Sequence, residues 1–419
     1  MAAHRTLLGI ATRFNRKAGG GAACRGGSGV PPLSLGQKRR GRRIHFRTAR
    51  APGLAPILGA ILILLACPLR IRAAPSEIRL EGSRPELVFA CELSDAPLQA
   101  LFADGTVISE LKQLHAGVCL VISDLDPARA AVVRRLTGSG VPVIAWAALP
   151  KDEGYYLNAA NGAQALAWFG KFQQWTADNR LRWAAVGLDI EPTLEDYGAA
   201  PPGRSHGLFW TFARRYFDYG RVDRGRRDYT ELIRRTHAAG YRVQTYQLPF
   251  IVDERQVRTT LLERLLGIVD VRGDEEILML YSSLTRGAGS ALIWSYGPFA
   301  QGIAVGCTTG EGAPGSPTGP LTWPQFTSDL IAASHYSRLV GIYSLEGCVR
   351  QGYLARLPAL DWSQPVLISP LGAAHMIHFR HAVHLALWMG AHLPYFAAIL
   401  ILLIAWWIRR RQARRLRSV

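Results

Sequence analysis

Two carboxylates stand together at the end of one predicted strand. Residues 183–192 read Trp-Ala-Ala-Val-Gly-Leu-Asp-Ile-Glu-Pro, an apolar run that closes on Asp189 and Glu191. Because side chains alternate along a strand, both acids share the face of Trp183, and the apolar residues between them point to the other face. Buried carboxylates cost several kcal/mol unless they are paired or hydrogen-bonded. Two acids at one strand tip therefore favour general acid chemistry, with a helix cap before Pro192 as the structural alternative.

Eight short apolar runs alternate with longer amphipathic stretches along the middle of the chain. They are predicted as strands at Leu87–Leu93, Val118–Asp124, Val141–Ala147, Trp183–Glu191, Tyr241–Leu248, Ile277–Tyr281, Ile303–Cys307 and Leu339–Leu345. Helices are predicted between several of them, at Pro127–Leu136, Ala163–Thr176, Leu208–Ala238, Gln256–Leu266 and Trp323–Ser334. Apolar strands alternating with helices are typical of a parallel sheet covered on both faces, and eight units fit one closed (β/α)8 TIM barrel. An open doubly wound sheet is the rival, but no glycine-rich phosphate loop follows the first strand.

Such a barrel carries its chemistry at the carboxyl ends of its strands. Acids, aromatic rings and amides gather at these ends. The candidate substrate-binding residues are Glu92, Asp124, Trp146, Tyr155, Tyr156, Asn158, Tyr246, Gln247 and Tyr281. Glycoside hydrolysis uses an acid to protonate the leaving oxygen, a second group to stabilise the cationic sugar, and rings that stack on pyranose faces. The rim supplies all three and favours a carbohydrate site, although each aromatic residue alone is compatible with core packing.

A further carboxylate ends the last predicted strand. Glu346 follows Ile342 and Ser344 at alternate positions, so it is expected to point at the barrel axis. With Glu191 as the acid, Glu346 would be the nucleophile or base, and the separation of the two carboxyl groups would decide between retention and inversion. The structural alternative is that Glu346 holds a loop backbone or pairs with Arg350.

The triplet Asp189-Ile190-Glu191 resembles the end of the fourth strand in glycoside hydrolase family 18, the chitinase-like barrels. The resemblance implies that Glu191 is the proton donor and that Asp189 orients the substrate's N-acetyl group, which acts as the internal nucleophile. The neighbouring charge is consistent with this assignment, because it raises the affinity of Glu191 for its proton. Two earlier acids of that family's longer motif fall here on Ala184 and Gly187.

The net charge of +18 is concentrated at the two ends of the chain. Residues 1–72 hold fourteen Lys or Arg and no acid, and residues 409–417 add six Arg. Without these twenty cations the chain has a net charge of −2. Because the body of the protein offers no phosphate-binding excess, a nucleic-acid partner is not expected.

Two apolar segments adjoin the basic ends. Residues 51–72 are predicted to be a signal peptide or signal-anchor helix, behind a basic and disordered region 1–50; whether the segment is cleaved stays open. Residues 373–408 are predicted to form an interfacial helix and a transmembrane helix, followed by a basic tail 409–419. Because basic flanks stay in the cytoplasm, the barrel domain 75–365 is expected on the periplasmic or extracellular side of the membrane.

The cysteines and histidines show no metal-ligand spacing. The six cysteines include no Cys-x-x-Cys pair, and Cys307 and Cys348 are compatible with a disulfide or with two buried thiols. Four histidines between residues 375 and 384 recur every three positions, which drifts around a helix and makes no single ligand face. Neither a metal nor a cofactor is expected.

These patterns predict a membrane-anchored, outward-facing glycoside hydrolase that acts on a polysaccharide or glycan. Glu191 is its expected proton donor, assisted by Asp189, with Glu92 and Glu346 in the pocket. The competing hypothesis is a non-catalytic glycan-binding or envelope polysaccharide assembly protein on the same barrel. A metal-dependent deacetylase is disfavoured, because the rim lacks a His/Asp ligand set.

Overall fold

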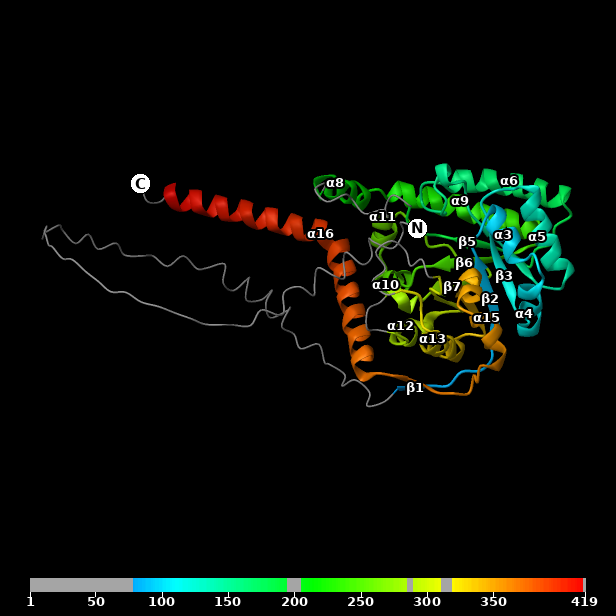
Figure 1. The fold of residues 1–419 in the computed structure, drawn as a ribbon. Coiled ribbons are helices and arrows are strands. Elements are labelled where there is room, and N and C mark those ends of the chain that lie inside the picture. The colour runs from blue at the N-terminus through cyan, green and yellow to red at the C-terminus, as the bar shows by residue number, and fades with distance from the viewer. Residues whose placement is uncertain (1–77, 194–204, 285–288, 310–318, 417–419) are drawn as a thin grey trace, which may run out of the picture. The chain divides into compact units, whose positions relative to one another are not determined.

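The computed structural model describes residues 78–193, 205–284, 289–309 and 319–416 (Figure 1). The predicted N-terminal region 1–50 and signal segment 51–72 lie outside these residues.

Eight parallel strands close into a barrel in sequence order. They are β2 (Glu86–Cys91), β3 (Gly117–Ile122), β4 (Val143–Ala147), β5 (Ala185–Asp189), β6 (Arg242–Gln247), β7 (Glu275–Met279), β8 (Gly302–Gly306) and β9 (Leu339–Tyr343). The last strand pairs with the first, with Glu86 opposite Leu339 and Ala90 opposite Tyr343. Each predicted strand overlaps an observed one, so the (β/α)8 prediction is confirmed and the open sheet is excluded.

Helices cover the outside of the barrel (Figure 1). In chain order they are α3 (Asp95–Leu101), α4 (Thr106–Leu114), α5 (Pro127–Gly138), α6 (Gly162–Asp178), α8 (Ser205–Tyr216), α9 (Tyr219–Ala238), α10 (Phe250–Val257), α11 (Leu261–Leu266), α12 (Ala291–Tyr296), α13 (Trp323–Tyr336), α14 (Leu345–Arg350) and α15 (Tyr353–Arg356). Short 3-10 turns follow β4, β7, α12 and α15, at Lys151–Glu153, Ser282–Leu284, Gly297–Phe299 and Leu357–Ala359.

Two predicted helices are each divided in the structure. The predicted helix 208–238 is α8 and α9, because Asp218 starts a new helix by accepting a hydrogen bond from the backbone N–H of Arg221 (3.1 Å). The predicted helix 256–266 is the end of α10 and all of α11, because Arg258 adopts a left-handed conformation (φ 59°) that ends α10.

The main hydrophobic core lies between the strands and the helices. Val186 and Leu188 of β5 point into it, as their alternation predicts. Trp183 also lies there: its ring is 5.4 Å from that of Phe172, and its indole N–H donates to Thr176 (3.0 Å). The prediction that Trp183 shares the face of Asp189 is therefore wrong. The strand begins only at residue 185, so alternation does not extend back to the tryptophan.

A two-stranded ribbon lies outside the barrel. Strand β1 (Ile78–Leu80) pairs antiparallel with β10 (Val366–Ile368), with Ile78 opposite Ile368. The ribbon joins the two ends of the barrel domain. The long helix α16 (Pro370–Leu416) begins directly after it.

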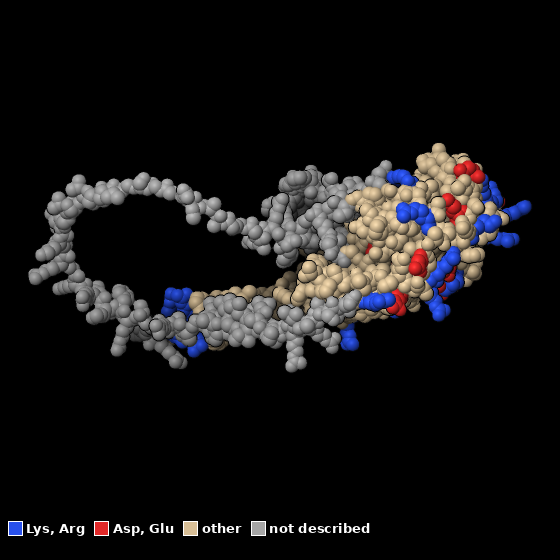
Figure 2. All heavy atoms as spheres, turned by 60° about the horizontal axis from the view of Figure 1, so that its bottom comes forward, with Lys and Arg blue, Asp and Glu red and all other residues tan. Residues whose placement is uncertain are grey.

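Helix α16 has two distinct halves. The first half packs against α10, α11 and α12 and buries Met376 and Leu387. In the second half every large apolar side chain from Tyr395 to Ile408 is exposed, and the sequence has no charged residue there before Arg409; Figure 2 shows the basic cluster at the end of the helix. Among the described residues, α16 is the helix long and apolar enough to cross a membrane, with a mean hydropathy of 2.0 over its most apolar stretch.

Candidate active site

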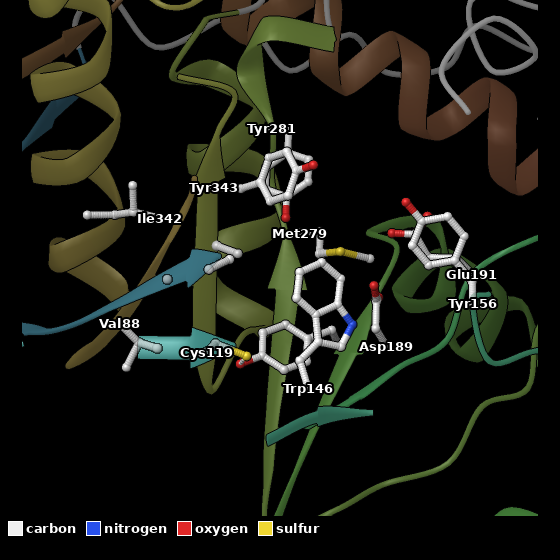
Figure 3. A pocket seen from close by; sticks show the side chains of 14 residues that line it. Val88, Cys119, Trp146, Tyr156, Asp189, Glu191, Met279, Tyr281, Ile342 and Tyr343 are labelled. Atoms are coloured by element: carbon white, nitrogen blue, oxygen red, sulfur yellow. Dashed lines mark hydrogen bonds between the residues drawn. The ribbon is translucent and has the colours of Figure 1, made fainter. Parts of the chain in front are cut away.

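A pocket occupies the carboxyl end of the barrel (Figure 3). All eight barrel strands contribute to it, and its empty space, including solvent at the mouth, is about 660 Å³. It is lined by Val88, Ala90, Cys119, Trp146, Tyr156, Asp189, Glu191, Tyr246, Met279, Tyr281, Ala304, Gly341, Ile342 and Tyr343. This end of the barrel is where (β/α)8 folds bind their ligands.

Asp189 and Glu191 both line this pocket, as the alternation in β5 predicts. Asp189 is the last residue of the strand and is only 4% exposed, whereas Glu191 is partly exposed nearer the mouth. The backbone beyond the strand is held in place: the N–H of Glu191 donates to the carbonyl of Leu157 (3.0 Å), and the N–H of Ile190 donates to that of Tyr246 (3.3 Å). The two carboxyls therefore sit on a fixed strand end.

Burial raises the pKa of Asp189 well above its usual range, and the negative charges of Glu191 and then Glu92 raise it further. Asp189 thus keeps a proton at pH values at which an exposed aspartate is ionised. The charge repulsion expected from the sequence acts here on Asp189, the more buried of the two acids. The pair can hold one proton inside the pocket, next to any group bound there.

Two buried polar atoms in the pocket have no hydrogen-bond partner among the described residues. They are Nε1 of Trp146 and Oδ1 of Asp189. Figure 3 shows the indole nitrogen turned toward the carboxyl; the two groups do not form a well-aligned hydrogen bond, but the indole N–H is close enough to offset part of the rise in the pKa of Asp189. Leaving a buried donor and acceptor unpaired costs about 1–3 kcal/mol each. A bound group that offers one acceptor and one donor would recover that cost.

Glu92 lies beside the pocket and is held by two tyrosines. The hydroxyl of Tyr155 donates to one carboxylate oxygen (2.7 Å), and the hydroxyl of Tyr343 donates to the other. Both oxygens of Glu92 are therefore engaged, and Glu92 is not among the residues that line the pocket. Its negative charge, after burial, raises the pKa of Tyr343 and so keeps that hydroxyl a donor.

Aromatic rings form much of the wall. Tyr281 and Tyr343 lie with their ring centroids 5.8 Å apart, and Tyr156 lies edge-on against Tyr155 at 4.9 Å. Tyr246 reaches across the floor and fills the space beside Gly187, where an added Cβ would lie 3.0 Å from the ring. The predicted aromatic residues Trp146, Tyr156, Tyr246 and Tyr281 thus come together in one pocket.

Three predicted substrate-binding residues are instead engaged in holding loops and helices. Asp124 accepts hydrogen bonds from the guanidinium of buried Arg129 (2.8 Å to Nε), and neither residue lines the pocket. Asn158 is buried, with its amide bound to the backbone of its own loop. Gln247 is fully buried on the helix side of β6 and donates toward backbone carbonyls. Asn158 and Gln247 satisfy backbone groups near the strand ends, whereas Asp124 compensates the charge of a buried arginine.

The predicted position of Glu346 is wrong. Strand β9 ends at Tyr343, and Ser344 caps α14 by accepting from the N–H of Gly347, so Glu346 lies in the first turn of a helix. In β9 the side chain of Tyr343 packs inside the barrel with Val88 and Trp146, whereas that of Ile342 belongs to the main core between strands and helices. Glu346 is not among the pocket-lining residues. Burial raises its pKa.

Eight of the fourteen lining residues were not identified as site residues from the sequence: Val88, Ala90, Cys119, Met279, Ala304, Gly341, Ile342 and Tyr343. Most are the inward members of correctly predicted strands. Small side chains at inward positions, such as Ala90, Ala304 and Gly341, were the available signal, because they leave open space at the axis.

Cys307 and Cys348 are free and buried, which decides between the two possibilities left open by the sequence. Over the described ranges, no group of three or more His, Cys, Asp or Glu side chains is placed to hold a metal ion.

Comparison with known proteins finds no matching family model and no matching curated protein. Solved structures do match. The PgaB glycoside hydrolase domain of Bordetella bronchiseptica is 12% identical with a TM-score of 0.41, covering 65% of this chain and 98% of that one. A 3-keto-D-glucoside 4-epimerase of E. coli is 13% identical with a TM-score of 0.36, covering 65% and 97%. A D-allulose 3-epimerase of Methylomonas sp. is 10% identical with a TM-score of 0.35, covering 72% and 99%. At these identities the similarity concerns the fold alone.

Proposed function

We propose that this protein is a glycoside hydrolase that cleaves next to an N-acetylated sugar. Glu191 would donate the proton to the leaving oxygen, and Asp189 would bind the amide of the sugar's N-acetyl group. The observation that carries the proposal is that Asp189 and Glu191 are the two carboxyls lining the pocket in the described part of the chain.

The other predicted acids are poorly placed to act as a second catalytic carboxylate. Glu92 uses both oxygens to accept from tyrosine hydroxyls, Asp124 pairs with Arg129, and Glu346 lies off the pocket. A mechanism with one carboxyl acid and a nucleophile supplied by the substrate fits this arrangement better than one with two opposed carboxylates.

In the proposed reaction, the one proton held by the Asp189–Glu191 pair is transferred by Glu191 to the glycosidic oxygen while the bond from that oxygen to the anomeric carbon breaks. The amide oxygen of the N-acetyl group bonds to the same carbon. Water then attacks the anomeric carbon, the amide oxygen leaves, and ionised Glu191 takes the proton from the water. Atoms and charges balance, and the enzyme returns to its starting state.

The unpaired atoms of the pocket support an amide as the group that is bound. An amide carbonyl can accept from Nε1 of Trp146, and an amide N–H can donate to Oδ1 of Asp189, which are the two unpartnered atoms. The rings of Tyr156, Tyr281 and Tyr343 offer surfaces on which pyranose faces can stack.

The exposed apolar half of α16 supports membrane anchoring. The basic residues that follow it would stay in the cytoplasm and leave the barrel on the periplasmic or extracellular side. There the pocket could meet an envelope or extracellular glycan.

The test is release of new sugar ends by the purified full-length chain in detergent, from chitin oligomers and a panel of bacterial and plant polysaccharides. We expect Glu191→Gln to lower the rate about 100-fold or more. Glu346→Gln is the matched control, since it removes the same charge from a carboxyl outside the pocket and should retain most of the activity. Binding without cleavage by the folded parent chain would instead support the non-catalytic glycan-binding hypothesis.

A further inference from the structure

Three helices that pack against α16 leave the carboxyl end of the barrel. Helices α10 and α11 follow β6, and α12 follows β7. Helix α9 runs from Tyr219 back to the start of β6 at Arg242, so its first residue also lies at the carboxyl end. The first half of α16 packs against α10, α11 and α12. The pocket and the attachment of α16 are therefore on the same end of the molecule.

A buried ion pair fixes α16 to this end. Asp253 of α10 is fully buried and accepts from Nε of Arg380 (2.8 Å), Nε2 of His384 (2.9 Å) and the hydroxyl of Tyr296. Arg380 also donates to the carbonyl of Ser295 (2.7 Å) and lies over the Tyr296 ring at 4.4 Å. Because so many groups share one buried carboxylate, the helix and the barrel are held as one body.

A second attachment lies further along α16. The hydroxyl of Tyr216, the last residue of α8, donates to the carbonyl of Gly390 (2.7 Å). Gly390 also allows a close approach, since an added Cβ would lie 2.4 Å from a methyl carbon of Leu261. Arg264 lies over the rings of Tyr216 and Tyr219, at 5.2 and 4.0 Å. The corner between α8 and α9 is thus fixed beside Gly390.

The length of the apolar segment determines where a bilayer would meet this corner. A helix needs about 20 residues to cross the hydrocarbon layer. Counted back from Ile408, the last residue before the basic cluster, such a span begins near residue 389. Helix α16 contains Pro394 and bends along its length (Figure 1). Trp388 and Trp406 are half-exposed near the two ends of the span, where tryptophans collect at membrane interfaces. Gly390 would therefore lie at the border of the hydrocarbon.

The side chains of the corner suit a lipid headgroup layer. Phe217 is 68% exposed and Tyr219 is 54% exposed, although both are large aromatic residues. Arg214 and Arg224 flank them in the sequence and are also exposed. Aromatic rings beside arginines are the composition that binds to anionic lipid surfaces.

We propose that the carboxyl end of the barrel docks on the membrane surface through the α8–α9 corner (residues 214–224), with the lipid bilayer as its partner. The barrel is then held with its pocket end toward the bilayer and does not swing freely on a tether. This proposal needs α16 to cross the membrane, but it does not depend on the chemistry proposed for the pocket.

The test uses the full-length chain in vesicles of phosphatidylcholine and phosphatidylglycerol, carrying an environment-sensitive fluorophore on a single introduced cysteine. Phe217→Cys reports on the corner. Ala238→Cys is the matched control, since it is exposed at the other end of α9, about 28 Å away. The four described native cysteines are buried, and the unsubstituted chain measures labelling elsewhere. Arg214→Cys serves as a second corner position should Phe217→Cys fail to fold.

Spin-labelled lipid with its nitroxide near the headgroup should quench the fluorescence of the corner label. The label at residue 238 should keep the intensity that it has in vesicles without spin-labelled lipid. Equal quenching of the labels at the corner and at residue 238 would overturn the proposal. So would the absence of quenching at both corner positions, 217 and 214, in a chain that stays in the membrane during extraction with alkaline carbonate. Extraction of the chain by carbonate would overturn it as well, because α16 would then not cross the bilayer.

Discussion

Replacing Arg380 with methionine should destabilise the protein by about 3 kcal/mol. Asp253 is fully buried, and the Arg380 side chain is only 12% exposed. Removing one member of a buried ion pair costs about 3–5 kcal/mol, because the remaining charge loses its compensation. We expect the lower end of that range, since His384 and Tyr296 still donate to Asp253. Methionine keeps the bulk of the arginine stem, so little cavity cost is added.

The assay is thermal unfolding of the full-length chain in detergent, followed by tryptophan fluorescence. In a domain of this size about 1 kcal/mol lowers Tm by about 2 °C, so we expect a drop of about 6 °C. Arg79→Met is the control: the Arg79–Glu81 pair is exposed at both side chains, and such pairs contribute under about 1 kcal/mol.

A double-mutant comparison tests the reasoning itself. In the Arg380→Met background, Asp253→Asn should cost much less than it does in the parent chain, because the carboxylate has already lost its main counter-charge. If Arg380→Met shifts Tm no more than Arg79→Met, or if the effects of the two substitutions at residues 380 and 253 are additive, then the buried pair does not hold α16 to the barrel.

Three further predictions concern buried groups. Burial raises the pKa of Asp329 to about 6, so the folded state binds this proton more tightly than the unfolded chain and the free energy of unfolding falls as the pH rises from about 4 to 6. Asp329→Asn should therefore recover up to about 3 kcal/mol at pH 8 but little at pH 4. Measurements of Tm at both pH values would check this. Trp146→Phe, made in an inactive Glu191→Gln chain, should weaken binding of an N-acetylated oligosaccharide and leave binding of its deacetylated counterpart unchanged; equal weakening of both by calorimetry would contradict the amide contact. Burial raises the pKa of Cys307 to about 11 and that of Cys348 to about 12, so both thiols should react with a disulfide reagent only after unfolding, and reactivity in the native chain would count against the packing described.

The barrel could be predicted because each strand is a short apolar run with its own helix after it. Parallel strands buried on both faces need such runs, and few other folds repeat the unit eight times. The breaks at Asp218 and Arg258 could not be read from hydrophobic periodicity, because they depend on one capping hydrogen bond and one left-handed residue.

The acid pair of the site was predicted for a local reason. Beyond the last residue of β5, Asp189, the backbone stays paired, because Ile190 bridges Leu157, and alternation therefore still places Glu191 on the side of Asp189. Glu346 shows how that argument fails. The predicted strand extends two residues past Tyr343, the true end of β9. Strand alternation was therefore applied to Glu346, which is a helical residue, and it does not give the direction of that side chain. Asp124 shows a different limit, because its partner Arg129 sits on a helix, and an isolated sequence does not tell a paired carboxylate from one that faces a ligand.

The attachment of α16 to the barrel could not be predicted from the sequence. Asp253 and Arg380 are 127 positions apart, and each looks like an ordinary charged residue in an amphipathic helix. The four histidines between residues 375 and 384 lie in the segment that is predicted to begin with an interfacial helix. The structure gives one of them, His384, a specific partner in Asp253.

The most direct test of the central claim compares cleavage of chitin oligomers with cleavage of the same oligomers after chemical deacetylation, using the full-length chain and its Glu191→Gln variant. The proposed mechanism requires the N-acetyl group, so the parent chain should release new ends only from the acetylated oligomers, and the variant should release almost none. Equal cleavage of both substrates by the parent, or undiminished cleavage by Glu191→Gln, would contradict the roles assigned to Asp189 and Glu191.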